Sequence, residues 1–295
     1  MKDKAKLIIS MLAFGTVGLF VKGINMPSSI IALVRGGIAT LFLFVFSRLR
    51  KSPLDTAAIK KNIAPLLISG CCIGFNWILL FEAYRYTTVA VATLCYYLAP
   101  VFVILVSPLI LKERLTLRKG ICVFTALLGM VFVSGVADSG GISGIRGILF
   151  GTGAAVLYAC VMLINKKMPD IGGFDRTLVQ LGSATAALLP YGLTTEWGNK
   201  LDLSAKGVVL LVILGVFHTG ICYAMYFSSL KDLPAQTSAI LSYIDPVSAI
   251  ILSAILLNEK MTVFGIIGAV LLLGAMLCSE LSFRKNTKNK TKRML

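Results

Sequence analysis

Residues 97–116 read YLAPVFVILVSPLILKERLT, and residues 243–262 read YIDPVSAIILSAILLNEKMT. A shift of 146 positions superimposes the two segments, and most of the mismatches exchange one aliphatic residue for another. The identical pairs include Tyr97/Tyr243, Pro100/Pro246, Ser107/Ser253, Glu113/Glu259 and Thr116/Thr262. Each segment is a long apolar run that holds a proline and ends in a charged turn, which is typical of a membrane helix and its exit. A repeat of half the chain length indicates a duplicated membrane unit.

The composition supports this assignment. The chain has 295 residues, of which 57% are hydrophobic and only 14% charged, and its mean hydropathy is +0.87. A soluble domain of this size needs more charge to cover its surface, so the composition indicates an integral membrane protein. The first apolar run starts at Leu7 and is followed by no small-residue cleavage site, so we expect a retained helix and not a signal peptide.

The apolar runs predict an all-α integral membrane fold with ten transmembrane helices arranged as two five-helix inverted repeats. The expected units are 1–140 for the first repeat, 141–283 for the second and 284–295 for a basic cytoplasmic tail, which we expect to be disordered. The expected helices are 7–23, 28–47, 63–83, 88–111, 118–136, 145–165, 174–194, 207–228, 234–257 and 262–281.

The basic residues predict the orientation in the cell membrane. With the N-terminus in the cytoplasm, 22 of the 29 Lys and Arg fall on the cytoplasmic side, six fall outside, and Arg35 lies within a helix. This bias predicts cytoplasmic N- and C-termini. Because each half has five helices, the second half enters from the opposite side, with Glu113 cytoplasmic and Glu259 external. Although the net charge is +16, the basic residues lie at the ends of apolar runs, which argues against nucleic acid as a partner.

Inverted repeats are a recurring plan of secondary transporters, in which two similar halves rock about a site near the midplane. Here each half closes on a proline-containing helix and a short acidic turn, Lys112-Glu113-Arg114-Leu115 and Asn258-Glu259-Lys260-Met261. These features, with Asn76-Trp77 and the segment 81–88, resemble the EamA-like branch of the drug/metabolite transporter superfamily. The resemblance covers essentially the whole chain. It implies a central cavity among the first, third, fourth, sixth, eighth and ninth helices. It also implies a family that moves amino acids, nucleotide-like vitamins, quaternary amines and other solutes, mostly as exporters.

Asp245 is the sharpest candidate for substrate binding or proton coupling. It lies about eleven residues into its predicted helix, which places it near mid-bilayer by the rise of about 1.5 Å per residue. A carboxylate there is costly and usually faces a cavity or a partner. Either it meets a substrate ammonium group or a proton, or it forms a structural pair, for example with Arg35. Its repeat mate is Ala99, so such a site is asymmetric.

Aromatic and polar residues of neighbouring helices complete the predicted cavity. Tyr97 and Tyr243, each three residues before a proline, offer hydroxyls and rings to a substrate. His218, the only histidine, is either a titrating residue or a neutral hydrogen-bonding one. The full set of expected substrate-binding residues is Phe14, Asn76, Trp77, Tyr97, Tyr158, His218, Tyr243 and Asp245.

Three other groups of residues have competing interpretations. Glu82 is either a cation-sensing coupling residue or, more simply, a partner of Arg85. Arg35 could clamp a substrate carboxylate, but the resemblance places its helix at the periphery, which favours a structural ion pair or a side chain that snorkels to the interface. Glu113 and Glu259 are expected to cap helices or to pair with nearby basic residues.

Backbone features give two further expectations. Pro100 and Pro246 each remove a mid-helix hydrogen bond and are predicted to act as hinges. The small-residue pairs Gly70/Gly74 and Gly147/Gly151 are predicted to allow close helix contacts. The seven cysteines lie within apolar runs without paired spacing, so we expect neither a disulfide framework nor a metal site.

We therefore predict a secondary transporter that exports a small metabolite, an amino acid or a related amine, by alternating access and without a cofactor. Protons are a candidate coupling ion, with Asp245, His218 and Glu82 as candidate coupling residues. Uptake of a polar solute by the same fold is the first alternative. An intramembrane enzyme lacks the constellation it needs, since Asp245 has no second intramembrane aspartate. A non-transporting scaffold leaves Asp245 and the inverted repeat unexplained.

Overall fold

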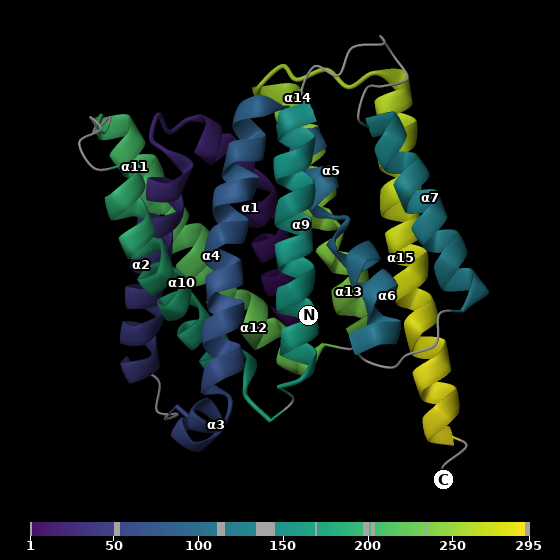
Figure 1. The fold of residues 1–295 in the computed structure, drawn as a ribbon, viewed down its shortest axis with the longest axis horizontal. Helices are drawn as coiled ribbons and strands as arrows, with labels where there is room; N and C mark the ends of the chain where they lie inside the picture. Colours follow the sequence, from purple (N-terminus) through teal and green to yellow (C-terminus); the bar gives the residue numbers. More distant parts are fainter. Residues whose placement is uncertain are drawn as a thin grey trace.

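The computed structural model describes residues 2–49, 54–110, 116–133, 145–168, 170–196, 201, 204–233 and 235–292, and within these residues it is helical without strands. In the first half the helices are α1 (Lys2–Lys22), α2 (Ser28–Leu49), α3 (Thr56–Lys61), α4 (Ile63–Tyr86), α5 (Val89–Tyr96), α6 (Ala99–Ile110) and α7 (Leu117–Val133). In the second half they are α9 (Ile145–Lys166), α10 (Gly173–Thr195), α11 (Ala205–Ile213), the π-helix η1 (Leu214–Ile221), α12 (Cys222–Asp232), α13 (Ala235–Ser242), α14 (Ile244–Leu256) and α15 (Val263–Lys292) (Figure 1).

Six helical segments of the described chain are long and apolar enough to cross a bilayer. They are Asp3–Lys22, Ser28–Leu49, Ile63–Tyr86, Val89–Ile110, Ile145–Lys166 and Ala205–Tyr226, and two shorter apolar helices cover Ile240–Leu256 and Val263–Ser279. The predicted all-helical membrane fold is therefore confirmed, whereas the count of ten spans stays a prediction. The short helix α3, which Asp55 caps by accepting a hydrogen bond from the Ala58 backbone amide, was not expected from the sequence.

The 146-residue shift relates helices as well as residues. It carries α2 onto 174–195, α5 onto 235–242 and α7 onto 263–279, which coincide with α10, α13 and the first part of α15. We call two helices related by this shift mates. Two pairs of mates pack against each other, α2 against α10 and α7 against α15. Figure 1 shows α7 and α15 side by side at one edge of the bundle.

Mates run in opposite directions through the bundle. Lys22 at the end of α1 pairs with Glu259, which follows α14, and Glu259 also accepts a hydrogen bond from the Val89 amide at the start of α5. Gly147 near the start of α9 packs against Thr87, just before α5. The end of α1 and the start of its mate α9 therefore lie together, at what we call the Glu259 end of the bundle.

Both proline-containing helices are interrupted at the repeat-related tyrosines. Tyr97 follows the end of α5, and Tyr243 separates α13 from α14. Pro100 has no amide hydrogen to bond the carbonyl four residues earlier, and the Val101 amide bonds Leu98 instead of Tyr97. The predicted breaks near Pro100 and Pro246 are thus present in both halves, while motion about them stays a prediction.

The π-helix η1 is a local feature that the apolar pattern did not reveal. It interrupts one long helix formed by α11, η1 and α12. Gly215 and Gly220 allow α2 to pack closely, since a Cβ at either glycine would lie 2.6 Å from the side chain of Ile38 or Phe42. The Thr219 hydroxyl donates to the Leu214 carbonyl five residues earlier, at 2.9 Å. Such π segments often mark functional sites.

The expectation of a disordered tail from Arg284 is wrong within the described residues, because α15 continues to Lys292. After Gly274 the sequence of this helix contains no glycine or proline, and lysine and arginine are good helix formers.

Glycines hold the central helices close together, as predicted. A Cβ at Gly70 on α4 would lie 2.5 Å from the Ser183 Cβ of α10, and a Cβ at Gly151 on α9 would lie 2.8 Å from the Cys95 Cβ of α5. Gly74 and Gly147 meet α10 and Thr87 in the same way. These contacts allow α4 and α9 to pack closely beside the cavity described below.

We predict that Gly70→Ala destabilises the protein, because the added methyl group overpacks the contact between α4 and α10. Overpacking of this kind typically costs about 1–3 kcal/mol. Gly274→Ala is the matched control, since a Cβ at Gly274 meets nothing within 4 Å and alanine favours helix. Melting temperatures of the purified proteins should fall for Gly70→Ala only. Equal melting temperatures for the two variants would contradict the contact.

Candidate substrate cavity

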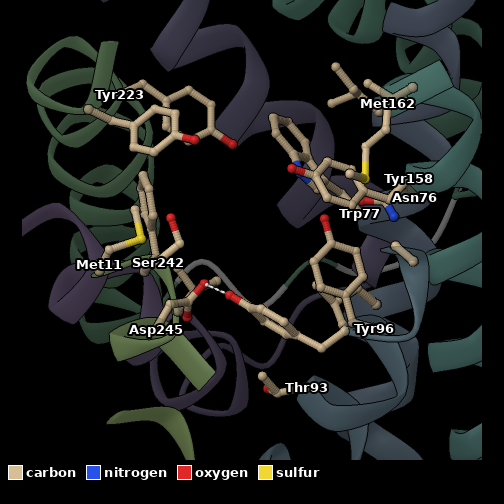
Figure 2. Close-up of a pocket in the computed structure, with 18 of the residues that line it drawn as sticks. Met11, Asn76, Trp77, Thr93, Tyr96, Tyr158, Met162, Tyr223, Ser242 and Asp245 are labelled. Atoms are coloured by element: carbon tan, nitrogen blue, oxygen red, sulfur yellow. Dashed lines mark hydrogen bonds between the residues drawn. The ribbon is translucent and has the colours of Figure 1, made fainter. Parts of the chain in front are cut away.

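A cavity of about 480 Å³ lies between the two halves. Its lining comes from α1, α2, α4, α5, α6, α9, α10, α12, α13 and α14. The family resemblance implied a cavity without the second and seventh helices, and this expectation is wrong, because Arg35 of α2 and several residues of α10 contribute to the wall. Figure 2 shows Met11, Ser242, Asp245 and Tyr223 facing Tyr96, Tyr158 and Trp77 across the open space.

Asp245 lies in the first turn of α14, directly after the interruption at Tyr243. Its side chain is partly exposed to the cavity, and its Oδ2 accepts a hydrogen bond of 2.8 Å from the Tyr97 hydroxyl (Figure 2). No lysine or arginine of the described chain pairs with it, so the alternative of a structural pair with Arg35 is wrong. The two helix interruptions therefore meet at one hydrogen bond, which joins the first half to the second.

The wall opposite Asp245 is aromatic. Tyr96 and Tyr158 stack with ring centroids 5.1 Å apart, and Trp77 lies beside them (Figure 2). Asn76 is buried, and its amide nitrogen donates to the Ala154 carbonyl at 2.5 Å, which ties α4 to α9. Asn76, Trp77 and Tyr158 thus line the cavity as predicted, although the Asn76 amide also has a structural partner.

A second aromatic group lies on the side of Asp245. Phe14 of α1 meets Tyr223 of α12 edge to face, with ring centroids 5.3 Å apart. Tyr226 packs against the same phenylalanine, with ring centroids 6.3 Å apart. All three residues line the cavity, so the prediction that Phe14 lies at the cavity is confirmed. The cavity therefore offers aromatic faces on both sides of a single carboxylate.

Arg35 of α2 also lines the cavity. Its side chain is only 4% exposed, and it forms no ion pair with any residue that the structure describes. Its Nε donates to the Thr219 hydroxyl at 2.6 Å, and its Cζ lies 4.6 Å from the centroid of the Trp77 ring. The expectation of a peripheral structural pair is wrong, because η1 and α4 enclose this part of α2.

His218 and Tyr243 lie outside the cavity lining. His218 is buried, with Nε2 2.8 Å from the Thr16 hydroxyl and Nδ1 3.3 Å from the Ile213 carbonyl oxygen. Tyr243 packs behind Tyr97, at 6.5 Å between ring centroids. Direct contact of either residue with a substrate finds no support in this arrangement.

Three acidic residues were expected to pair near the membrane surface. Glu82 pairs with Arg85 at 3.4 Å and does not line the cavity, which supports the simpler interpretation. Glu259 pairs with Lys22 at 2.5 Å and also accepts from the Val89 amide at 2.8 Å, so it both pairs and caps a helix as predicted. Glu113 lies outside the described residues.

These contacts join α1, α5 and the segment after α14 at the Glu259 end. Towards the opposite end the cavity reaches Asn165, next to the last residue of α9, and Arg176 in the first turn of α10. The bundle is thus held together by polar contacts at one end, and the charged aromatic cavity extends towards the other.

Comparison with known proteins agrees with this architecture. The EamA-like transporter family model matches twice, at residues 5–135 and 145–280. The chain belongs to the EamA-like transporter family. The two matches correspond to the two halves of the fold and cover most of the chain.

Curated relatives of this family are named as transporters. An uncharacterized transporter of Bacillus subtilis, YxxF, is 30% identical over 92% of this chain and 87% of its own length. The biotin transporter of Escherichia coli K12 is 27% identical over 78% of this chain and 75% of its own. A crystal structure at 17% identity covers 96% of this chain and 98% of its own with a TM-score of 0.64, which shows a shared fold.

We predict that Glu259→Gln opens the Glu259 end of the cavity more often, because the substitution removes the charge that pairs with Lys22. Ala249→Cys, at a cavity-lining position, would report this opening through its labelling by a membrane-impermeant maleimide, in a background without the native cysteines. The label is applied from the Glu259 side of the membrane, where labelling should become several-fold faster.

Glu82→Gln is the matched control, because it removes an ion pair within one helix and leaves the contacts between helices intact. If both substitutions changed the labelling rate equally, the Lys22–Glu259 contact would not be what closes the cavity.

Proposed function

We propose that this protein is a secondary transporter that exports a small metabolite bearing an ammonium group, an amino acid or a related amine, by alternating access. In this proposal, α7, α10, α13–α14 and α15 complete ten membrane passes with the six apolar segments. The halves 1–140 and 141–283 form inverted repeats, both termini lie in the cytoplasm, and the Glu259 end faces outward.

The observation that carries this proposal is the Asp245 carboxylate. It lines a cavity of about 480 Å³, no cation of the described chain pairs with it, and aromatic side chains surround it. An unpaired carboxylate within the bilayer is costly unless a cavity or partner compensates it. A substrate ammonium group would supply the missing charge, and the tyrosine rings would cover its apolar body or the cation itself.

The interrupted helices supply a means of opening and closing. A break in a membrane helix is tolerated where it lines a cavity, and the breaks at Tyr97 and Tyr243 lie beside Pro100 and Pro246 in both halves. In the proposed cycle the halves rotate about these breaks, so that the Lys22–Glu259 contact separates when the outer side opens. The proposed coupling ion is the proton, which would bind to the Asp245 carboxylate.

Two alternatives are distinguished by experiment. Import of a polar solute uses the same cavity, and the relative named as a biotin transporter gives one candidate solute. An intramembrane enzyme would need a second reactive group beside Asp245. Among the cavity residues, the side-chain partner of Asp245 is the Tyr97 hydroxyl, which we place in substrate binding.

A thermal-shift screen against amino acids, polyamines, quaternary amines, nucleosides and biotin would identify ligands, since a ligand that binds the folded state raises its melting temperature. Flux of each ligand in proteoliposomes, loaded inside or outside with and without a pH gradient, would then give direction and coupling.

We predict that Asp245→Asn lowers transport of an ammonium-bearing substrate by about 10- to 100-fold while the protein still inserts. A hydrogen bond to a charged group contributes about 1.5–3 kcal/mol, and a tenfold change in affinity corresponds to about 1.4 kcal/mol. Asp175→Asn is the matched control, because Asp175 accepts a hydrogen bond from the Asp55 backbone amide and is not part of the cavity lining. Wild-type flux in Asp245→Asn would refute the role of this carboxylate.

We also predict that Tyr97→Phe weakens substrate binding less than Asp245→Asn does, because it removes only the hydroxyl that holds Asp245. Tyr243→Phe should leave the affinity unchanged, since Tyr243 lies outside the cavity lining. Titrations of the two variants by the ligand-induced thermal shift would check this order, and a larger effect at Tyr243 would contradict it.

A further inference from the structure

Arg35 is an unpaired cation inside the cavity wall. The guanidinium offers five N–H donors, and only Nε has a hydrogen-bond partner in the described chain, the Thr219 hydroxyl at 2.6 Å. The side chain is 4% exposed and lines the cavity. No aspartate or glutamate of the described chain pairs with it.

The surroundings of Arg35 fix its position without neutralising its charge. Its Cζ lies 4.6 Å from the centroid of Trp77 and 5.6 Å from that of Phe81, which are cation–π distances. Thr219 is itself held by its hydrogen bond to the Leu214 carbonyl in η1. The guanidinium is therefore oriented in advance, and its Nη groups have no hydrogen-bond acceptor among the described residues.

We infer that Arg35 is the binding site for a carboxylate of the transported solute. Guanidinium groups bind carboxylates through two parallel N–H bonds, and the Nη pair has the geometry for this end-on contact while Nε keeps Thr219. The inference rests on the proposed function and makes it more specific, because it adds a negative group to the ammonium group that Asp245 would bind.

The relation of Arg35 to Asp245 indicates a zwitterion. No ion pair joins them, so each charge is left for the solute. Tyr84, Tyr96 and Tyr223 line the same cavity as both charges. A dianion such as a phosphate ester would be repelled by Asp245 at this site. A solute with one carboxylate and one ammonium group matches both poles.

Matched ligand trios test this inference. Each trio contains an amino acid, the amine that remains without the carboxylate, and the acid that remains without the ammonium group. The probes are phenylalanine, 2-phenylethylamine and 3-phenylpropionate, together with leucine, 3-methylbutylamine and 4-methylpentanoate. Apparent affinities come from ligand-induced thermal shifts, each measured against the unliganded melting temperature of the same variant.

The wild-type protein should bind an amino acid at least about tenfold more tightly than the matching amine. Arg35→Gln should remove this preference, lowering the affinity for the amino acid and the acid by about tenfold or more and leaving that for the amine within about twofold. Asp245→Asn should show the converse pattern. Arg48→Gln is the matched control, since Arg48 is on the same helix with its Cζ 4.9 Å from the Phe44 ring centroid and lies outside the cavity lining.

The contrary outcomes are separable. If amines bind as well as amino acids, or if Arg35→Gln keeps the preference for the carboxylate, the inference is overturned and the proposed function stands. If none of the six probes binds the wild-type protein, the inference is overturned, and the wider thermal-shift screen decides the proposed function. Should Arg35→Gln fail to fold, the preference for the amino acid over the amine is compared between Arg35→Lys and the wild type. A lysine keeps the positive charge but lacks the paired N–H donors of the guanidinium, so Arg35→Lys should retain only part of the wild-type preference.

Discussion

The hydrogen bond from the Tyr97 hydroxyl to Asp245 connects the two interrupted helices of this protein. Each interruption exists because a proline removes a backbone hydrogen bond in the middle of an otherwise continuous helix. In a bilayer, such a break is tolerated only where protein or a cavity surrounds the freed backbone groups. The cavity and the breaks therefore depend on one another, and the position of Asp245 directly after the second break places its charge in the same chamber.

The bundle around this chamber is built by repetition. The shift that aligns Tyr97 with Tyr243 also aligns whole helices, and α2 and α7 pack against their own mates α10 and α15. Glycines on α4 and α9 hold those helices tightly against their neighbours beside the cavity. The Lys22–Glu259 pair joins helices at one end of the bundle, while the cavity reaches towards Arg176 at the other. In the proposed alternating-access cycle, this arrangement corresponds to one of the two states.

Much of this was predictable from the sequence because the bilayer imposes strong rules. The apolar runs predicted the helical fold, and the repeat predicted which helices correspond in the two halves. The two prolines predicted the helix interruptions to within a few residues. Phe14, Trp77, Tyr158 and Asp245 were correctly placed at the cavity from their depth and from the family resemblance. Local backbone geometry was not predictable in this way. The π-helix η1 directs Thr219 towards Arg35, and no periodicity in the sequence signals that turn. Arg35 was assigned to a peripheral helix from the family resemblance, and His218 was assigned to the cavity, whose lining does not include it.

The central claim is that two halves of opposite orientation enclose one charged cavity. Sidedness of the repeat-related residues Thr116 and Thr262 tests it most directly, because both lie just before the last helix of their half. Each would be replaced singly by cysteine in a background without native cysteines and labelled in intact cells with a membrane-impermeant maleimide. The account predicts that the cysteine at position 262 is labelled from outside, and that the one at 116 is labelled only after the membrane is opened. Labelling of both from the same side would contradict the inverted arrangement.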